Sequence, residues 1–266
     1  MAKSFSLARL NTLVKSLSTI SPFSSDFASK IGNASSAEVT LISSAVSPNV
    51  KIVFCPETIG SVAYALTQDI SNVDFMIAVD ICGNVNSILM QKSFDGEHIS
   101  NKAVHLALHS MGESYRKGVF RNTIGSDEYV FNDPLIGIPG IMLSTHPYKE
   151  YHTDQDTPDK INYEQIEKMG KVIQKAIEIY ENDFVLKREF KGQLMRSKYG
   201  IQTPNQQVNL SWDYFIYSID GKKTLIELCC DFGLDFDFTL GIINQMIENG
   251  DITKVSSPDI SKKSEQ

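Results

Sequence analysis

The segment from Pro134 to Leu143 is the part of the sequence that most constrains the fold. It reads Pro-Leu-Ile-Gly-Ile-Pro-Gly-Ile-Met-Leu, so glycines and prolines frame a short apolar run with the length of a buried strand. Polar residues flank it on both sides, because Gly-Ser-Asp-Glu-Tyr begins at Gly125 and Tyr-His-Thr-Asp-Gln-Asp-Thr begins at Tyr151. A histidine that follows a buried strand, with carboxylates on either side, is typical of a metal or acid/base site.

Short apolar runs alternate with helical patterns between residues 49 and 183. We expect strands at residues 50–55, 75–79 and 138–143, and helices at residues 59–66, 100–115 and 162–180. The last of these helices has apolar residues at helical spacing, which gives it one stripe that faces inward. Strands that alternate with helices predict an α/β fold with a mostly parallel sheet and helices on both faces.

Three residues that suit a metal or acid/base site follow the expected strands. Glu57 comes after the first strand, Asp80 ends the second and His152 follows the third. The carboxyl ends of parallel strands meet at one edge, so these side chains should lie at the same edge of the sheet. Zinc binds imidazole nitrogen and carboxylate oxygen, and a carboxylate base accepts the proton of metal-bound water. Two other interpretations stay open, because Glu57 also suits a helix N-terminus and Asp80 also suits a turn.

Three short motifs carry a resemblance to a known family. They are Pro-Glu-Thr-Ile-Gly at residues 56–60, Gly-Ser-Asp-Glu at residues 125–128 and Glu-Tyr-His-Thr at residues 150–153. Together they resemble the di-zinc aminopeptidase superfamily, and within it a bacterial aminopeptidase-like domain of polysaccharide-biosynthesis proteins that is followed by a winged helix. The resemblance covers roughly residues 50 to 255.

This resemblance implies a zinc metallohydrolase in which metal-activated water attacks a peptide or amide bond. It implies that Glu57 is the general base or a terminal ligand, and that Asp80 and His152 are metal ligands. It also places four residues near the substrate or around the ligands: Asp127, Glu128, Tyr151 and Asp156. For Asp127 and Glu128 the alternative is that they only cap a turn.

The upstream part of the sequence departs from the family pattern. The family has its first zinc-ligating histidine and its bridging aspartate before the Pro-Glu-Thr-Ile-Gly motif, but no histidine precedes His98 here, and Asp26 lies in an unrelated serine-rich context. We therefore expect one zinc or none, where the family has two, and an enzyme whose activity is in doubt. The alternative function is a non-catalytic, truncated relative that serves as an interaction scaffold through its winged helix.

A second histidine pair has the spacing of a zinc site but lacks its other parts. His105 and His109 are four residues apart on an expected helix, yet no glutamate follows the first histidine, as the metalloprotease motif requires. We interpret them as one half-exposed helix face.

The first 48 residues are rich in serine and unlike the rest of the chain. Leu7, Leu10, Leu13, Val14 and Leu17 predict a short amphipathic helix. A transit peptide would have this composition, but the bacterial character of the remainder favours a replaced or truncated N-terminal half. The strand expected at residues 50–55 would then expose an edge, so we expect a homo-oligomer or a poorly soluble protein.

The C-terminal part predicts a linker at residues 184–208, a winged-helix-like domain at residues 209–255 and a disordered tail at residues 256–266. Helices are expected at residues 210–217, 224–232 and 235–248, with a turn at Asp220-Gly221 and a strand at residues 251–255. The third helix carries Asp235, Asp237 and Glu248 and has no lysine or arginine, so it repels phosphate. This argues against DNA binding and favours a packing or dimerisation module.

Composition narrows the class of protein further. The net charge of -7 and pI near 5.3 disfavour nucleic acid or an anionic membrane as the main partner. No apolar stretch approaches the roughly 20 residues of a membrane span. The four cysteines lie in apolar runs, which indicates reduced thiols and a cytoplasmic protein.

Overall fold

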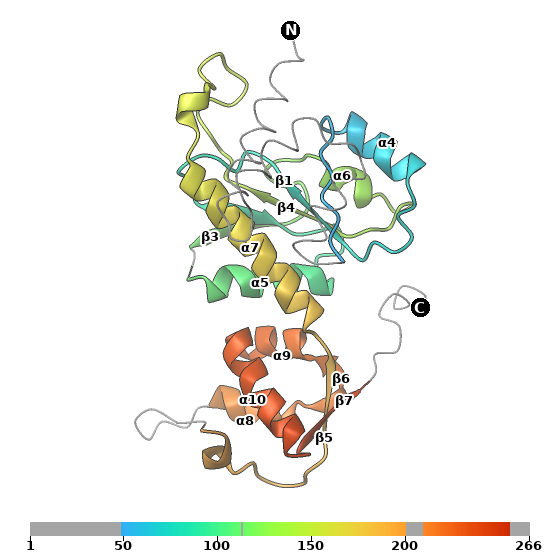
Figure 1. Cartoon of the computed structure of the whole chain (residues 1–266), viewed down its shortest axis with the longest axis vertical. Helices are drawn as coiled ribbons and strands as arrows, with labels where there is room; N and C mark the ends of the chain where they lie inside the picture. Colours follow the sequence, from blue (N-terminus) through green and yellow to red (C-terminus); the bar gives the residue numbers. More distant parts are fainter. Residues whose placement is uncertain (1–48, 113, 201–209, 256–266) are drawn as a thin grey trace, which may run out of the picture. The chain divides into compact units, whose positions relative to one another are not determined.

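A computed structural model describes residues 49–112, 114–200 and 210–255 (Figure 1). The amphipathic helix expected near the N-terminus and the tail expected at residues 256–266 lie outside these described residues. The chain divides into two compact units. Of the described residues, unit 1 contains 49–96 and 114–174, and unit 2 contains 97–112, 175–200 and 210–255.

Unit 1 is built on a four-stranded sheet. Its strands are β1 (Met76–Val79), β2 (Ile88–Gln91), β3 (Tyr115–Gly118) and β4 (Gly140–Ser144), in the order β1-β4-β2-β3. β1 pairs with β4 in parallel and β2 with β3 in parallel, whereas β2 and β4 are antiparallel. The chain therefore has the mostly parallel α/β architecture that the sequence predicts.

The central strands of this sheet are buried along their whole length. All residues of β2 and β4 are buried, as expected for strands covered on both faces. Helices α4 (Ile59–Thr67) and α6 (Glu128–Phe131) form a core together, in which Ala65, Val130, Phe131 and Ile138 are buried. Hydrophobic packing therefore holds α4 against α6, although the two are far apart in the sequence.

One close approach fixes α6 to the sheet. Asn132, which ends α6, donates from Nδ2 to the carbonyls of Glu128 and Gly140, both at 2.8 Å, and its Oδ1 accepts from the Gly140 N–H at 3.1 Å. A Cβ at Gly140 would lie 2.8 Å from Asn132 Nδ2 and 2.9 Å from the Glu128 carbonyl oxygen. The glycine is therefore needed where the end of α6 meets the start of β4.

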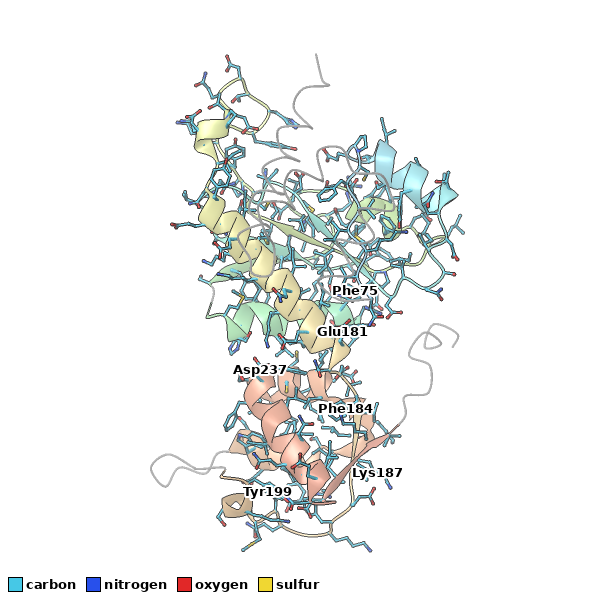
Figure 2. The ribbon with its side chains drawn as sticks, in the orientation of Figure 1. Phe75, Glu181, Phe184, Lys187, Tyr199 and Asp237 are labelled. Atoms are coloured by element: carbon cyan, nitrogen blue, oxygen red, sulfur yellow. The ribbon has the colours of Figure 1, made fainter. Side chains whose placement is uncertain are left out.

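Unit 2 combines helices with a small antiparallel sheet. Its strands are β5 (Val185–Arg188), β6 (Asp220–Thr224) and β7 (Ile252–Val255), with β5 in the centre. Figure 2 labels Lys187, which lies in β5, and Phe184, which directly precedes this strand. The helices are α5 (Ile99–Ser110), α8 (Leu210–Tyr217), α9 (Leu225–Phe232) and α10 (Phe236–Glu248), and η2 (Arg196–Tyr199) is a short 3-10 turn. The long helix α7 (Tyr163–Glu181) follows the turn η1 (Pro158–Lys160), and its residues are divided between the units.

Local sequence signals set the helix starts in unit 2. Thr224 and Glu227 form a capping box at α9, in which each side chain accepts the other's backbone N–H. Asp235 caps α10 by accepting from the Phe238 N–H at 2.8 Å. The buried core between these helices contains Phe215, Leu225, Phe236 and Ile243. The expected helices at residues 210–217, 224–232 and 235–248 are confirmed.

Several expected elements differ from the structure. Residues 50–55 form no strand, because this stretch has no hydrogen-bonded partner strand among the described residues. The helix expected at residues 100–115 ends at Ser110, since Gly112 adopts a φ of 66° and Tyr115 already begins β3. β2 was not expected at all.

The expected linker also contains regular structure. Residues 185–188 form β5, the central strand of the second sheet, because Val185 and Leu186 are buried there. The turn expected at Asp220-Gly221 lies within β6, which pairs with β5. Among the described residues, no helix is long and apolar enough to cross a membrane.

Candidate functional site

Glu57 lies on an unusual turn just before α4, which we call the 56–60 turn. The Ile59 N–H donates to the Glu57 carbonyl at 2.7 Å, and Thr58 between them has φ 61° and ψ −60°. These values describe a classic γ-turn, which is rare and strained, most of all for a β-branched residue. A Cβ at Gly60 would lie 2.5 Å from Cys55 Cβ, so the turn also requires glycine at this position. The motif Pro-Glu-Thr-Ile-Gly thus encodes one strained turn with Glu57 exposed on it.

The Gly-Ser-Asp-Glu motif contacts this turn directly through residues 126–128, which we call the 126–128 turn. Ser126 Oγ donates to Glu57 Oε1 at 3.3 Å, and the Thr58 N–H donates to Asp127 Oδ1 at 2.7 Å. The Thr58 side chain makes no capping hydrogen bond to α4, so the Asp127 carboxylate satisfies a backbone donor near the start of this helix. Two motifs 69 residues apart are therefore joined by two hydrogen bonds.

Glu128 anchors the 126–128 turn from inside the protein. Its side chain is buried, with the residue 1% exposed, and its Oε2 accepts from the Ser126 N–H at 2.9 Å. Its Oε1 has no hydrogen-bond partner in the described part of the chain. Loss of solvation on burial raises the pKa of this carboxyl, although the Ser126 N–H and the charge of Arg121 act in the opposite direction. Glu128 is thus a carboxyl that holds its proton more readily than usual.

Cys55 adjoins the same turns but does not suit a chemical role. Burial and the nearby Asp127 charge raise the pKa of its thiol to about 11. Nucleophilic attack and metal ligation both require the thiolate. Cys55 therefore stays protonated at neutral pH, as we expect for a reduced structural thiol.

Asp80 follows β1 at its carboxyl end, as the sequence predicts. Its Oδ1 accepts from the Ile81 N–H at 2.8 Å, and Ile81 has a φ of 49°. The Asp80 N–H donates to the Leu143 carbonyl at 3.3 Å, and the Thr145 N–H donates to the Ile81 carbonyl at 2.9 Å. Asp80 is therefore held beside the carboxyl end of the neighbouring strand β4.

His152 and its neighbours lie on the loop that follows β4, which we call the 145–157 loop. His152 is exposed, has a φ of 62°, and its ring stacks on that of Tyr151 with centroids 3.8 Å apart. The Tyr151 ring also packs edge-on against His146 at 5.6 Å. In the same loop, the Tyr148 hydroxyl donates to Asp156. Tyr151 and Asp156 thus both support the loop that carries His152.

The expected site residues therefore fall into two groups. Glu57, Asp127 and Glu128 come together at the two joined turns, whereas Asp80 and the 145–157 loop follow the carboxyl ends of the adjacent parallel strands β1 and β4. Within the residues that the structure describes, no three histidine, cysteine, aspartate or glutamate side chains group closely enough to hold a metal ion.

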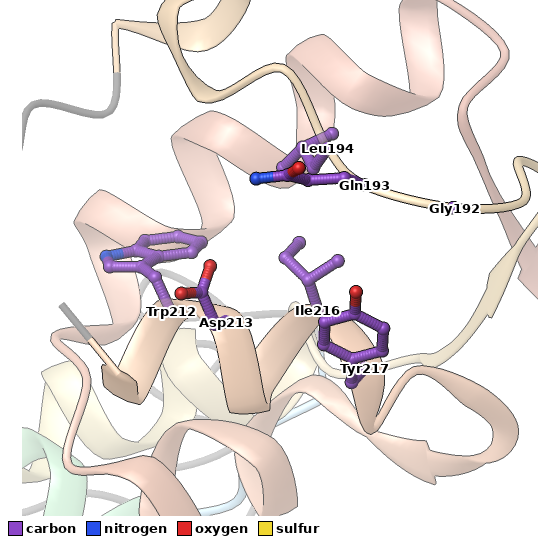
Figure 3. A pocket seen from close by; sticks show the side chains of 7 residues that line it. All are labelled: Gly192, Gln193, Leu194, Trp212, Asp213, Ile216 and Tyr217. Atoms are coloured by element: carbon purple, nitrogen blue, oxygen red, sulfur yellow. The ribbon is translucent and has the colours of Figure 1, made fainter. Parts of the chain in front are cut away.

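Two further features of the chain are the histidine pair on α5 and a pocket in unit 2. His105 and His109 lie on α5 with ring centroids 6.4 Å apart, and His109 is exposed. Unit 2 contains a pocket against α8 that the sequence did not reveal, and Figure 3 shows its lining. The lining residues are Gly192, Gln193, Leu194, Trp212, Asp213, Ile216 and Tyr217. None of the expected site residues lies in it.

A family comparison identifies the main part of the chain. Residues 34–183 match the family described as Domain of unknown function (DUF4910). The chain belongs to this family. The matched region of this DUF4910 protein contains both joined turns, β1, β4 and the 145–157 loop, and no curated protein matches the chain.

Solved structures show which fold this DUF4910 protein has. A "putative peptidase" from Clostridium acetobutylicum is 21% identical with a TM-score of 0.65, over 82% of this chain and 52% of that one. An aminopeptidase from Aneurinibacillus sp. strain AM-1 is 25% identical, with a TM-score of 0.39 over 45% of this chain and 29% of that one. BSAP, a zinc aminopeptidase from Bacillus subtilis, is 19% identical, with a TM-score of 0.38 over 46% and 32% of the two chains.

The first of these likenesses shows that the chain has the fold of that peptidase. The DUF4910 protein spans about half the length of that peptidase.

Proposed function

We propose that this protein is a peptidase-like hydrolase that cleaves peptide or amide bonds, with Glu57 as its general base. The observation that carries the proposal is the presentation of Glu57 on a strained turn that a distant motif holds in place. Strained backbone persists where the surrounding structure fixes it, and such residues cluster at functional sites. The peptidase-like fold supports the reaction class.

The surroundings of Glu57 suit a base. The residue is exposed, and Ser126 Oγ donates to one of its carboxylate oxygens. An ionised carboxylate only accepts hydrogen bonds and has about four lone-pair positions, which is the form that a general base needs. In the proposed reaction Glu57 takes that proton, the water oxygen bonds to the carbonyl carbon, and the C–N bond then breaks as the nitrogen is protonated.

We also propose roles for the remaining expected residues. Asp80 and His152 are the side chains we assign as ligands of a single zinc, which supplies Lewis-acid activation of water when it is bound. Their place after the parallel strands β1 and β4 supports this assignment. Tyr151 and Asp156 are assigned to the surroundings of the substrate or of the ligands, and Asp127 and Glu128 are assigned to the support of Glu57. We further propose that the protein is a cytoplasmic homo-oligomer.

A second candidate function is a non-catalytic scaffold that acts through its C-terminal module. One observation favours it: unit 2 contains helices and strands in an order that suits a winged helix. In this proposal α10 is a packing or dimerisation helix, since it and its cap carry Asp235, Asp237 and Glu248 and no basic residue.

The experiment that separates the two candidates combines metal analysis with an activity assay. The full chain is purified without chelator, its zinc content is measured, and it is tested on a panel of aminoacyl p-nitroanilides with and without added zinc. We expect hydrolysis that falls by about 100-fold or more in Glu57→Gln, the loss typical of a missing general base. Glu164→Gln, an exposed glutamate on α7, is the matched control. No hydrolysis by the wild type under either condition would favour the scaffold.

A further inference from the structure

Residues 126–128 hold Glu57 in place, although Asp127 and Glu128 were expected to lie near the substrate or around the metal ligands. Both hydrogen bonds that reach the 56–60 turn from residues 126–128 act on neighbouring groups: one on the Glu57 carboxylate, the other on the Thr58 backbone N–H. A glutamate side chain has several staggered rotamers, and each contact that it makes favours some of them over others. The contact with Ser126 Oγ selects the arrangements in which Oε1 faces the 126–128 turn.

The second hydrogen bond stabilises the strained backbone beneath the carboxylate. Thr58 at φ 61° is unfavourable for a β-branched residue and needs surrounding contacts to keep it there. The bond from its N–H to Asp127 Oδ1 is short at 2.7 Å and is strengthened by the carboxylate charge. Asp127 is therefore already engaged by the protein and fixes the direction in which Glu57 leaves the main chain.

A continuous set of contacts connects these groups to the sheet. Asn132 bonds to Gly140 at the start of β4 and to the Glu128 carbonyl. The buried Glu128 carboxyl in turn accepts from the Ser126 N–H, and Ser126 Oγ reaches Glu57. Each bond is 3.3 Å or shorter. These hydrogen bonds, together with the backbone of residues 126–132, thus connect the Glu57 carboxylate to the buried strand β4.

We infer that Ser126, Asp127 and Glu128 are positioning residues for Glu57, and that they do not contact the substrate. The role of these residues in catalysis rests on the proposed function. Their contact with the Glu57 carboxylate does not, and it can be measured without any enzyme activity. Ser126 orients the carboxylate, Asp127 fixes the backbone that carries it, and Glu128 fixes Ser126.

The first test observes the Glu57 carboxylate directly. The full chain is labelled with ¹³C at the glutamate carboxyls, and the Glu57 resonance is identified by its loss in Glu57→Gln. At a fixed neutral pH we expect Ser126→Ala to move this resonance, because one oxygen loses its O–H donor, and Ser126→Thr to restore it. Ser71→Ala is the matched control and should leave the Glu57 resonance unmoved. It also removes a serine hydroxyl from a carboxylate, because Ser71 Oγ donates to the exposed Asp69 at 2.7 Å.

The second test measures whether the hydrogen bond from Ser126 to Glu57 affects the rate of hydrolysis. With an aminoacyl p-nitroanilide, Ser126→Ala should lower kcat about 10-fold with KM unchanged within twofold, and Ser126→Thr should recover most of kcat. A rise in KM with kcat unchanged would instead make Ser126 a substrate contact and overturn the inference.

The outcomes of the two tests are separable. An unmoved Glu57 resonance in Ser126→Ala overturns the inference whatever the activity. A moved resonance in a wild type that lacks hydrolysis supports the hold on Glu57 and rejects only the proposed function. If circular dichroism shows that Ser126→Ala does not fold, Asp127→Ala and Asp127→Asn replace it, and only the former should move the resonance, since asparagine keeps the acceptor for the Thr58 N–H.

Discussion

The two groups of candidate residues in unit 1 are held in different ways. The 56–60 turn is held by hydrogen bonds from a motif 69 residues away, with a buried carboxyl behind it.

The start of the 145–157 loop is also held by distant residues, because Asn86 Nδ2 donates to the Pro147 carbonyl and Arg116 donates to the His146 carbonyl. Farther along the loop a local contact appears, in which Tyr148 bonds to Asp156 eight positions on. Long-range bonds fix a side chain relative to the sheet, whereas local bonds fix a loop only relative to itself. We therefore expect residues 148–157 to be more adaptable than the 56–60 turn.

The largest effect should come from the glycine of the rigid turn. Gly60→Ala places a methyl group 2.5 Å from Cys55 Cβ, and neither atom is at the end of a flexible side chain. We expect a loss of about 2–3 kcal/mol in the free energy of unfolding, measured by urea titration. Gly241→Ala is the control, because a Cβ there meets no atom within 4 Å in helix α10, and it should stabilise by about 0.5–1 kcal/mol. Equal effects of the two variants would show that the turn is not tightly constrained.

Removal of the buried carboxyl should have the next largest effect. Glu128→Ala leaves the Ser126 N–H without its acceptor in a buried site, which costs about 1–3 kcal/mol. Glu128→Gln keeps an acceptor oxygen and should lose less. Urea titration of both variants at one pH gives the comparison, and an alanine variant as stable as the glutamine variant would argue against the anchoring role.

The same carboxyl gives the stability of the protein a defined pH dependence. Its pKa is raised above the ordinary value of 4.5, so the native state holds a proton that the unfolded chain has already released. Its contribution is therefore fully present below pH 4.5 and is lost as the pH rises through the raised native pKa. Urea midpoints measured across this range should fall less steeply with rising pH in Glu128→Gln than in the wild type. Parallel curves would contradict the assignment.

A variant of the adaptable loop should change local motion with little change in global stability. Tyr148→Phe removes the hydroxyl that donates to Asp156 and should cost at most about 1 kcal/mol. We expect faster amide hydrogen exchange confined to residues 145–157. Tyr163→Phe, at a half-exposed position on α7, is the control. A loss of stability as large as that of Gly60→Ala would remove the contrast between the two regions.

The smallest effect is expected at His152 itself. Its φ of 62° favours glycine, so His152→Gly relieves backbone strain while it loses the stacking on Tyr151. The two changes oppose each other and should leave the free energy of unfolding within about 1 kcal/mol of the wild type. Zinc content measured in the same variant should nevertheless fall if His152 is a metal ligand. Unchanged zinc would withdraw that role.

The sequence predicted those parts of the fold whose signals are local. β1 and β4 are apolar runs bounded by turn residues, and α9 begins at a capping box formed by Thr224 and Glu227. β2 has only three apolar residues before Gln91, and β3 contains Arg116 and Lys117, so neither has the apolar run that identified β1 and β4. Residues 50–55 have the composition of a strand, but composition does not supply a partner strand. β5 was hidden because Val185 and Leu186 are followed by charged residues.

In the candidate site, too, only the features that lie within a single motif were predictable. Glu57, Asp127 and Glu128 were each singled out by their motifs, and Asp80 and His152 follow β1 and β4 as the strand rule predicts. The hydrogen bonds between Ser126 and Glu57 and between Thr58 and Asp127 were not predictable, because nothing in either motif indicates that they meet. The strained φ of Thr58 is equally invisible in a sequence where threonine would suit an ordinary helix cap.

The 69-residue separation between Thr58 and Asp127 also orders events during synthesis. A ribosome makes the chain from the N-terminus, so the Pro-Glu-Thr-Ile-Gly segment is complete long before the residues that hold it exist. Closing so long a loop carries an entropic cost, which the packing of α4 against α6 helps to offset. A nascent chain that stops before Ser126 therefore contains Glu57 but lacks the two hydrogen bonds from residues 126–128, and these form only after those residues have been made.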